Sequence, residues 1–541
     1  MVWLLNDVYD VEHRAYFMSE KKMELTPLKI RSHGASSVMH YDERYTPYIE
    51  MTGLLPFVQL VSRSTPNLNA AAVTTLIDRW RPETHSFHLQ TGEMTVTLQD
   101  VSMITALPIE GKPLCMSTDS EGWRQQMEAL IGMSPQEPEV EDGGKKDRVP
   151  TGATFTWIAA NFAHCPEDAD DEVIQRYARV YMWYVISRTI FADGTGKNAP
   201  WMWLKALTVF DNKFSWGSTA LAYLYRQLDD ACRRTTKDGG VGGCMLLLSW
   251  DLVLEVASEV NLLYKQYTNE MDSLTPEQVE WEPYGVGTNF GDAHTFELNP
   301  LCVQERHLWL MRCPLICNWA VEFHLPHRVL RQFGYFQPHP PEWVDTDTQL
   351  HRLDRRRQRK IKDWRKHHKS YVLMFEQSVQ ATSSIQLTQY RQHCALAFSN
   401  YLRWFQESTR VEICPPAYEE DILEEPTEYD ELAQGGYSKL IREGYQTSFA
   451  PVLNFVAADD MTLKAFQRSA YMLKPRKEFK RYSPDDYAKG KNPVAGGSRL
   501  SRMRSMDDEV EDDDDDESDD PEQFVVARRK KLASKRGRGP K

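Results

Sequence analysis

The sequence contains no long hydrophobic run: none of its apolar stretches approaches 18 residues, whereas a membrane-spanning helix needs about 20. The opening residues, MVWLLNDVYDVEHR, lack a basic start and reach acidic residues at once, so we expect no secretory signal peptide. The nine cysteines lie between Cys115 and Cys414 without paired spacing. Such a set is typical of reduced thiols in the cytosol or nucleus rather than of a disulfide-stapled secreted domain.

A general excess of basic residues is also missing, because the formal net charge is −14. A hypothesis of nucleic-acid binding must therefore rest on local segments. The acidic balance arises partly near the end of the chain, where residues 507–522 contain 13 acids and no base. Residues 523–541 reverse this pattern with 8 bases and no acid. From about residue 474 the apolar pattern fades, which predicts a disordered tail.

The chain is rich in apolar and aromatic residues: 41% of it is hydrophobic, with 15 Trp and 24 Tyr, which predicts a large buried core. Apolar residues recur every four positions from Leu68 to Trp80, which predicts a helix. Asn67 would cap this helix and Pro82 would end it. Apolar and polar residues then alternate around a turn, which predicts a short β-hairpin over 84–96.

The stretch LIDRWRPETHSFHLQTGEMTVTLQD, which contains this hairpin, is crowded with charged residues and histidines. Thr97 and Asp100 fit a capping box at the start of a following helix. We expect most of the other charges to lie exposed, on a hairpin between two helices. On this interpretation Trp80→Ala unfolds the domain, whereas His85→Ala and Glu93→Ala are mild.

Helical patterns dominate the rest of the chain, and strand signals are few. We therefore predict a mainly α fold, with a multi-helix domain over 45–420 that contains the small hairpin. A loosely packed lead-in over 1–44 would precede it. A helical or irregular extension over 421–473 and the disordered tail over 474–541 would follow. The further helices are expected at 123–130, 170–190, 214–234, 244–250, 253–267, 300–333 and within 368–405.

Seven segments resemble one known family, in the order in which that family has them. They are LIDRWRPETHSFHLQTGEMTVTLQDVSMITALPIEGKP (76–113), FSWGSTALAYLYRQL (214–228), GCMLLLSW (243–250), VEWEPYG (279–285), WAVEFHLPHRVLRQFG (319–334), LHRLDRR (350–356) and YLRWFQESTRVEICPP (401–416). Together they resemble the plant mobile domain, found in the MAIN and MAIN-LIKE group, in plant protein phosphatase 7 long form homologues and in transposable elements. After GCMLLLSW the chain departs from that pattern, because the family usually has a longer Trp-containing segment there.

The resemblance implies a non-enzymatic nuclear scaffold that supports transposon silencing, genome integrity and meristem maintenance. It also implies a partner of the protein phosphatase 7 type and no cofactor. Two alternatives stay open: a DNA- or RNA-binding protein derived from a transposable element, and a cryptic metal-dependent phosphatase. The family-motif residues, expected to be structural, are Trp80, Arg81, Pro82, Glu83, His85, Phe87, Gly92, Glu93, Trp216, Trp319 and Arg328.

A phosphatase would need two metal ions, held by acidic residues, histidines and an asparagine on separate loops. The segment 289–297 places Gly291, Asp292 and His294 in the spacing of one phosphoprotein phosphatase motif, but Thr295 replaces its second glycine. Further phosphatase motifs are absent downstream, so we interpret these as loop residues. The sequence also has no G-x-S-x-G elbow and no complete phosphate-binding loop. We therefore expect no catalytic residue.

Two sets of residues resemble metal ligands. Cys313-x3-Cys317 is followed by His324-x2-His327, but only six residues separate the pairs. The run also looks helical as far as Pro326, which is unlike a zinc knuckle. We interpret these residues as two core thiols and two half-exposed imidazoles.

The second set crosses the predicted hairpin and comprises Glu83, His85, His88 and Glu93. His85 and His88 are three positions apart and would face opposite sides of a strand. The sequence therefore predicts no metal site here.

The strongest local signal for nucleic acid is HRLDRRRQRKIKDWRKHHK (351–369), with ten Lys or Arg against two Asp. As a helix with a face running from Leu353 to His368, it would carry basic side chains that could neutralise phosphates. The alternatives are a solvated helix whose charges pair with the acidic body, and a nuclear-import signal. The candidate nucleic-acid contacts are Arg355, Arg356, Arg357, Arg359, Lys360, Lys362, Arg365 and Lys366.

Two basic clusters near the end of the chain, ARRKK and KRGRGPK, predict nuclear import and hence a nuclear protein. KRGRGPK also resembles an AT-hook, which binds the minor groove, although Gly539 interrupts its Arg-Gly-Arg-Pro core. The acidic run 507–520 could bind histones or other basic partners, or shield the basic end. The candidate import residues are Arg528, Arg529, Lys530, Lys531, Lys535, Arg536 and Arg538.

Overall fold

The computed structural model describes residues 4–30, 38–63, 68–136, 151–193, 196–236, 239–248, 260–279, 281–284, 299–340, 350, 361–382 and 391–413. The chain divides into two units, Met1–Ala417 and Tyr418–Lys541, and the second lies wholly outside the described residues. The predicted extension, disordered tail and import residues lie outside them as well.

Helices dominate the described residues, as the sequence predicts. None of these helices is both long and apolar enough to cross a membrane. The α-helices are α1 (Asp7–Asp10), α2 (Arg14–Ser19), α3 (Thr46–Thr52), α4 (Leu55–Arg63), α5 (Ala70–Ile77), α6 (Leu98–Thr105), α7 (Trp123–Ile131), α8 (Phe155–Phe162), α9 (Asp171–Arg188), α10 (Trp201–Ala206), α11 (Trp216–Ala231), α12 (Val260–Asp272), α13 (Pro300–Val303), α15 (Trp364–His367), α16 (Lys369–Thr382) and α17 (Ala395–Ser408). Short 3-10 helices are η1 (Glu43–Tyr45), η2 (Phe210–Asn212), η3 (Met245–Leu248), η4 (Pro276–Gln278), η5 (Arg306–Leu308), η6 (Pro326–Arg328) and η7 (Leu330–Phe333).

The sheets among the described residues are small. β2 (Trp80–Arg81), β3 (Ser86–Leu89) and β4 (Gly92–Met94) form an antiparallel sheet that contains the predicted hairpin. The other pairs are β1 (Lys29–Ile30) with β7 (Gly240–Val241), β5 (Gly152–Thr154) with β6 (Asn198–Pro200), and β8 (Cys313–Cys317) with β9 (Ala320–His324). After the hairpin, the predicted capping box is confirmed at the start of α6.

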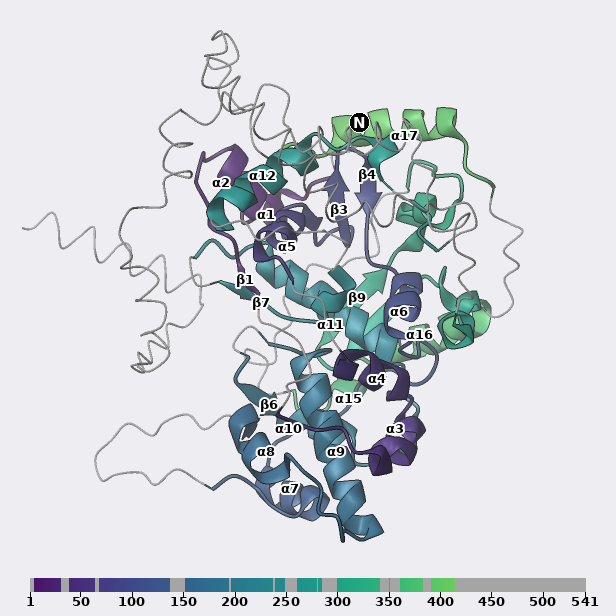
Figure 1. The fold of residues 1–541 in the computed structure, drawn as a ribbon. Coiled ribbons are helices and arrows are strands. Elements are labelled where there is room, and N and C mark those ends of the chain that lie inside the picture. The colour runs from purple at the N-terminus through teal and green to yellow at the C-terminus, as the bar shows by residue number, and fades with distance from the viewer. Residues whose placement is uncertain are drawn as a thin grey trace, which may run out of the picture. The chain divides into compact units, whose positions relative to one another are not determined.

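The helix α11 lies at the centre of the packing. Almost all of its side chains are buried, and it contacts β8, β9 and α6 (Figure 1). Trp216 and Tyr225 on this helix are at most 1% exposed. Gly217 allows the close approach of the neighbouring chain, since a Cβ there would lie 2.8 Å from both Ile109 Cγ2 and Val101 Cγ1.

One predicted helix boundary is wrong. The helix expected to run to Trp80 ends at Ile77, and its N-cap is Asn69, which accepts hydrogen bonds from two main-chain N–H groups. Asn67 lies outside the described residues. Trp80 instead begins β2, where it pairs with Phe87 of β3. The cross-strand partner thus overrides the helical period at this position.

The stretch 300–333 is not the helix that its apolar content predicts. Most of it forms the hairpin β8–β9 and short helices around it. Asn318 makes the turn of this hairpin with a φ of 49°, a left-handed conformation that asparagine tolerates better than most residues. Nearly every side chain of both strands is buried. The polar–apolar alternation that identifies a strand is therefore hidden.

The N-terminal segment also differs from expectation, because its described residues are packed rather than loose. Leu4, Tyr9 and Ala15 are at most 3% exposed. The N–H of Leu4 donates to the main-chain oxygen of Ser408 at 2.7 Å, and β1 lies parallel to β7. The segment therefore contributes to the core of the first unit.

Three other helical predictions hold in part. Within the described residues 244–248 of the helix expected at 244–250, Met245–Leu248 form a 3-10 helix. The helix expected over 253–267 is α12, whose described part begins at Val260. The region 368–405 contains α16 and most of α17, and residues 383–390 between them lie outside the described residues.

Candidate functional site, a buried polar network

The charged residues around the first hairpin are buried, contrary to the exposure expected for them. Those at most 3% exposed are Asp78, Arg79, Arg81, Glu83, His85, His88 and Glu93. Burying a charge costs several kcal/mol unless the charge is paired and hydrogen-bonded. The partners come from the N-terminal helices, α11, α12, the hairpin β8–β9 and residues 328–410, and they form four groups of contacts.

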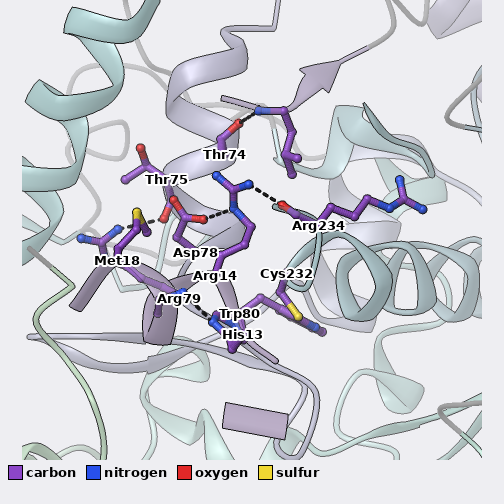
Figure 2. A network of polar contacts seen from close by, with 12 residues as sticks. His13, Arg14, Met18, Thr74, Thr75, Asp78, Arg79, Trp80, Cys232 and Arg234 are labelled. Atoms are coloured by element: carbon purple, nitrogen blue, oxygen red, sulfur yellow. Dashed lines mark hydrogen bonds and ion pairs between the residues drawn. The ribbon is translucent and has the colours of Figure 1, made fainter. Parts of the chain in front are cut away.

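The first group surrounds Asp78 (Figure 2). Arg14 Nε donates to Asp78 Oδ1 at 2.6 Å, and Arg14 Nη1 donates to the main-chain oxygen of Arg234 at 2.5 Å. The hydroxyl of Tyr264 donates to the other oxygen of Asp78. Burial, together with the Asp78 carboxylate, holds the pKa of Tyr264 well above its ordinary value, so the phenol keeps its proton. These contacts connect α2, α5 and α12.

His13 lies beside this group and is held neutral. Its Nε2 is 2.7 Å from the main-chain oxygen of Trp80, which can only accept, so Nε2 carries the proton. Its Nδ1 accepts from the N–H of Ala15 at 3.0 Å. Burial and the charge of Arg81 hold the pKa of His13 well below its ordinary value. The neighbouring Arg79 forms an ion pair with Asp272 of α12.

The second group joins His85, Asp229 and Glu322. His85 Nε2 is 2.9 Å from Glu322 Oε2 and 4.0 Å from Asp229 Oδ2, and His85 Nδ1 is 2.9 Å from a main-chain oxygen of β9. Trp80 Nε1 donates to Asp229 Oδ1 at 2.7 Å. Arg226 donates to Glu322 Oε1 through Nε. Both ring nitrogens of His85 thus face oxygen acceptors.

The third group is centred on Glu93. Its Oε1 accepts from Arg328 Nε at 2.7 Å and from Ser86 Oγ at 2.9 Å, and its Oε2 accepts from the hydroxyl of Tyr401 at 3.2 Å. Burial and the Glu93 charge raise the pKa of Tyr401 well above its ordinary value. Tyr401 therefore stays a donor, and the carboxylate is satisfied by three side chains.

His88 lies beside the third group and is also neutral. Its Nε2 is 3.0 Å from Thr84 Oγ1, and its Nδ1 is 2.5 Å from Thr409 Oγ1. Burial, with the charges of Arg81 and Arg328, holds the pKa of His88 well below its ordinary value. His88 thus contacts Thr84 and Thr409, whereas His85 contacts Glu322.

The fourth group ties both ends of the described chain to the first sheet. Arg81 Nη1 is 3.1 Å from Asp10 Oδ1, and Arg410 Nη2 is 2.9 Å from Asp10 Oδ2. The N–H of Asn6 donates to Glu83 Oε1 at 2.9 Å. Burial raises the pKa of Glu83 and lowers that of Arg81. The network therefore depends on residues at both ends of the domain.

The structure brings most of the family-motif residues to this network. Trp80, Arg81, Glu83, His85, Glu93 and Arg328 make polar contacts in it, and Pro82 and Phe87 are buried beside them. Gly92 begins β4 directly after the turn with a φ of 116°, and a Cβ there would lie 3.2 Å from the ring of Tyr401. Trp216 lies elsewhere, where its Nε1 donates to the main-chain oxygen of Thr52 at 3.0 Å. Trp319 is half-buried.

Sequence reasoning missed most of the partners: Arg14, Arg226, Asp229, Glu322 and Arg410. Two of them carry a signal in hindsight, because Arg226 and Glu322 are charges within the apolar runs YLYRQL and WAVEFH. A charge in a run that is otherwise buried predicts a buried partner. Arg14 and Arg410 carry no such signal.

The candidate zinc ligands do not converge. Cys313 and Cys317 are buried thiols in β8, as expected. His324 is fully buried, not half-exposed: its Nδ1 donates to the main-chain oxygen of Met311 at 2.6 Å, and its Nε2 accepts from Leu98 N at 3.3 Å. Burial lowers the pKa of His324 to about 4. Both nitrogens are thus engaged in the protein.

One group in the described part of the chain has the geometry to hold a metal ion. The potential ligand atoms of His85, Asp229 and Glu322 all lie within 4.8 Å of one another, and all three side chains are buried. The residues of the phosphatase-like spacing, Asp292 and His294, lie outside the described residues. Their interpretation as loop residues stays a prediction.

The basic segment is helical over a shorter range than predicted, so far as the structure describes it. Residues 351–360 lie outside the described part, and α15 contains only Trp364–His367, with Trp364 fully buried. Lys362 pairs with Asp119 at 3.0 Å. Within the described part of this segment, 361–369, Arg365, Lys366 and Lys369 are exposed and form no ion pair with a described residue.

Comparison with known proteins identifies one family. The family model described as "Plant mobile domain" matches residues 56–254 and 241–406. "Serine/threonine-protein phosphatase 7 long form homolog" of Arabidopsis thaliana is 30% identical over 64% of this chain and 27% of its own length. "Protein MAIN-LIKE 1" is 31% identical over 53% of this chain and 58% of its own length, and "Protein MAINTENANCE OF MERISTEMS" is 31% identical over 51% and 59%, both from the same plant. The chain thus spans less than two thirds of each of these relatives. No solved structure matches.

Proposed function

Because the chain belongs to the plant mobile domain family, we propose that it is a non-enzymatic nuclear scaffold that binds a protein partner. The observation that carries this proposal is the engagement of the charged side chains around the first hairpin. Glu93 accepts hydrogen bonds from three side chains, and His13 and His88 are held neutral by burial. A general acid or base must come within hydrogen-bond reach of its substrate. These groups instead contact the protein itself, which supports a role in the fold.

The names of the relatives support the finer part of the proposal. One is a homologue of protein phosphatase 7 and another is named for the maintenance of meristems. We propose a partner of the protein phosphatase 7 type, and a role in transposon silencing, genome integrity and meristem maintenance. The phosphatase name alone transfers no activity to this chain, since the match takes in 27% of that relative.

The scaffold proposal is tested by affinity purification of the full chain from plant nuclei, followed by mass spectrometry. We expect a protein phosphatase 7-type protein to be recovered at physiological salt. A variant without residues 507–541 should recover the same partner, because we place the binding surface on the folded unit. Any shorter variant must keep the N-terminal segment, because Arg14 is an ion-pair partner of the buried Asp78. Recovery of no such partner, or a turnover that His85→Gln abolishes, would contradict the proposal.

A second candidate function is direct binding of DNA or RNA, and one observation favours it. Arg365, Lys366 and Lys369 are exposed and make no ion pair among the described residues, so they are available to phosphates. Alanine at all three positions should weaken DNA binding by the full chain and reduce its salt dependence, since each lost phosphate contact removes about 0.9 from the logarithmic slope. Alanine at the exposed Lys21 and Lys22 is the control. Wild-type protein that binds neither DNA nor RNA at physiological salt would rule this candidate out.

A further inference from the structure

Three side chains from distant parts of the sequence meet in the second group of the network. His85 lies in the turn between β2 and β3, Asp229 in α11 and Glu322 in β9. The three residues are at most 1% exposed, and their potential ligand atoms lie within 4.8 Å of one another. Imidazole and carboxylate are common ligands of Zn²⁺ and related divalent metals.

In each of these side chains, the nitrogen or oxygen atom that does not face the other two residues is hydrogen-bonded to a neighbour. His85 Nδ1 donates to the main-chain oxygen of Phe323 at 2.9 Å. Asp229 Oδ1 accepts from Trp80 Nε1 at 2.7 Å, and Glu322 Oε1 accepts from Arg226. Metal-binding histidines almost always donate their other ring N–H to a carbonyl or carboxylate, and ligating carboxylates are hydrogen-bonded in turn. The arrangement around these three residues has this form.

The remaining nitrogen and oxygen atoms of the three side chains face one another across a space that could hold a small cation. His85 Nε2 is 2.9 Å from Glu322 Oε2 and 4.0 Å from Asp229 Oδ2. Bonds of about 2.0–2.2 Å to a tetrahedral ion place its ligand atoms roughly 3.3–3.6 Å apart. Small movements of the Glu322 and Asp229 carboxylates would therefore bring three protein ligands to this separation, and a water molecule would take the fourth position.

From this geometry we propose that His85, Asp229 and Glu322 form a buried structural site for a divalent metal of the zinc class. The two carboxylates carry two negative charges, and Arg226 supplies one positive charge. Because His85 Nδ1 donates to a carbonyl, a proton or a cation must lie between His85 Nε2 and Glu322 Oε2, which are 2.9 Å apart, and a bound metal ion would displace that proton to solvent. Because all three residues are buried, a substrate could not reach the ion, which suits a structural role. The inference goes beyond the proposed scaffold function, and that function does not depend on it.

The test begins with metal analysis of the full chain. Protein purified without chelator from zinc-supplemented cells should contain about one equivalent of zinc, measured by mass spectrometry. A wash with excess Mg²⁺ before the measurement removes zinc that is bound to the acidic run 507–522. Removal of the metal should lower the melting temperature by several degrees, and added zinc should restore it, because a ligand that binds only the folded state stabilises it. Cobalt in place of zinc should give visible absorption without the intense band of a thiolate ligand.

Variants identify the ligands. His85→Gln and Asp229→Asn should lose the metal, whereas Glu93→Gln, in the neighbouring buried group, should keep it despite a comparable loss of stability. Folded wild-type protein that takes up less than about a tenth of an equivalent of zinc or cobalt would overturn the proposal. So would metal binding with unchanged cobalt absorption in a folded His85→Gln variant. If both ligand variants fail to fold, the reversible zinc-dependent shift and the cobalt spectrum of the wild type decide the question.

Discussion

Glu93→Ala tests the physical basis of the buried network. The substitution removes a carboxylate that accepts from Arg328 at 2.7 Å, from Ser86 at 2.9 Å and from Tyr401 at 3.2 Å. The side chains of both Arg328 and Glu93 are at most 1% exposed. The guanidinium of Arg328 would then be buried without its counter-ion. The sequence, by contrast, predicts a mild effect because it places Glu93 on an exposed hairpin.

The expected loss follows from the burial of the pair. Removing one partner of a buried ion pair costs about 3–5 kcal/mol, because the other charge is left uncompensated. Unfolding entropy is about 2.1 cal/mol/K per residue, or roughly 0.9 kcal/mol/K for the unit Met1–Ala417. A loss of about 4 kcal/mol therefore lowers the melting temperature by about 4–5 °C. Glu93→Ala combined with Arg328→Met should recover part of this loss, since it removes both charges.

The assay is thermal unfolding of the full chain, followed by calorimetry and by tryptophan fluorescence. The matched control is Glu172→Gln, which removes a carboxylate from an ion pair whose acid is 73% exposed. An exposed pair contributes about 0–1 kcal/mol, so the control should shift the melting temperature by about 1 °C or less. If Glu93→Ala shifts it no further than this control, the third group is not a stabilising buried pair and the reasoning fails.

Four other predictions test separate parts of the structure. Trp80→Ala should cost about 3–5 kcal/mol and abolish the near-ultraviolet dichroism of the domain, because it also leaves the buried Asp229 without its indole donor; a native spectrum would contradict this. The pKa of His13 is lowered in the fold. Above the unfolded pKa of about 6.5 the histidine is neutral in both the folded and the unfolded state, so pH has no effect through this group. Below that pH the unfolded state binds a proton that the folded state does not, and the free energy of unfolding falls by about 1.4 kcal/mol per pH unit. Denaturant unfolding between pH 7.5 and 5.5 should show a shallower decline for His13→Asn than for wild type, and an equal decline would refute this cause. Gly217→Ala should lower the free energy of unfolding by about 1–3 kcal/mol in the same unfolding assay, despite the better helix propensity of alanine. An unchanged or higher free energy of unfolding would contradict the close packing of α11. Deleting 527–541 should reduce the nuclear accumulation of a fluorescent fusion, and a fully nuclear variant would place the import signal elsewhere.

Much of the helical architecture could be predicted because its signals are local. The helices α7, α9 and α11 fall where the apolar period places them, and the capping box of Thr97 and Asp100 connects residues three positions apart. The hairpin β3–β4 has a glycine turn between alternating residues. Such signals act within a few residues and need no partner from elsewhere in the chain.

Signals of this kind fail where both faces of an element are buried. The strands β8 and β9 contain no exposed residue, and their sequence is accordingly a nearly continuous apolar run. A run of this kind has no periodicity that separates a strand from a buried helix. The same limit explains Trp80, which satisfies a helical period but lies in a strand.

The sequence by itself determined the mainly helical fold, the first hairpin and the family pattern. The tertiary structure alone decided that the charges of the hairpin are buried, and which residues neutralise them. Arg14 and Asp78 are 64 positions apart, and Glu93 and Arg328 are 235 apart. The reason is physical: a charge can be buried only where another segment brings a counter-charge to it, and that meeting is set by the packing of the whole domain rather than by neighbours in sequence.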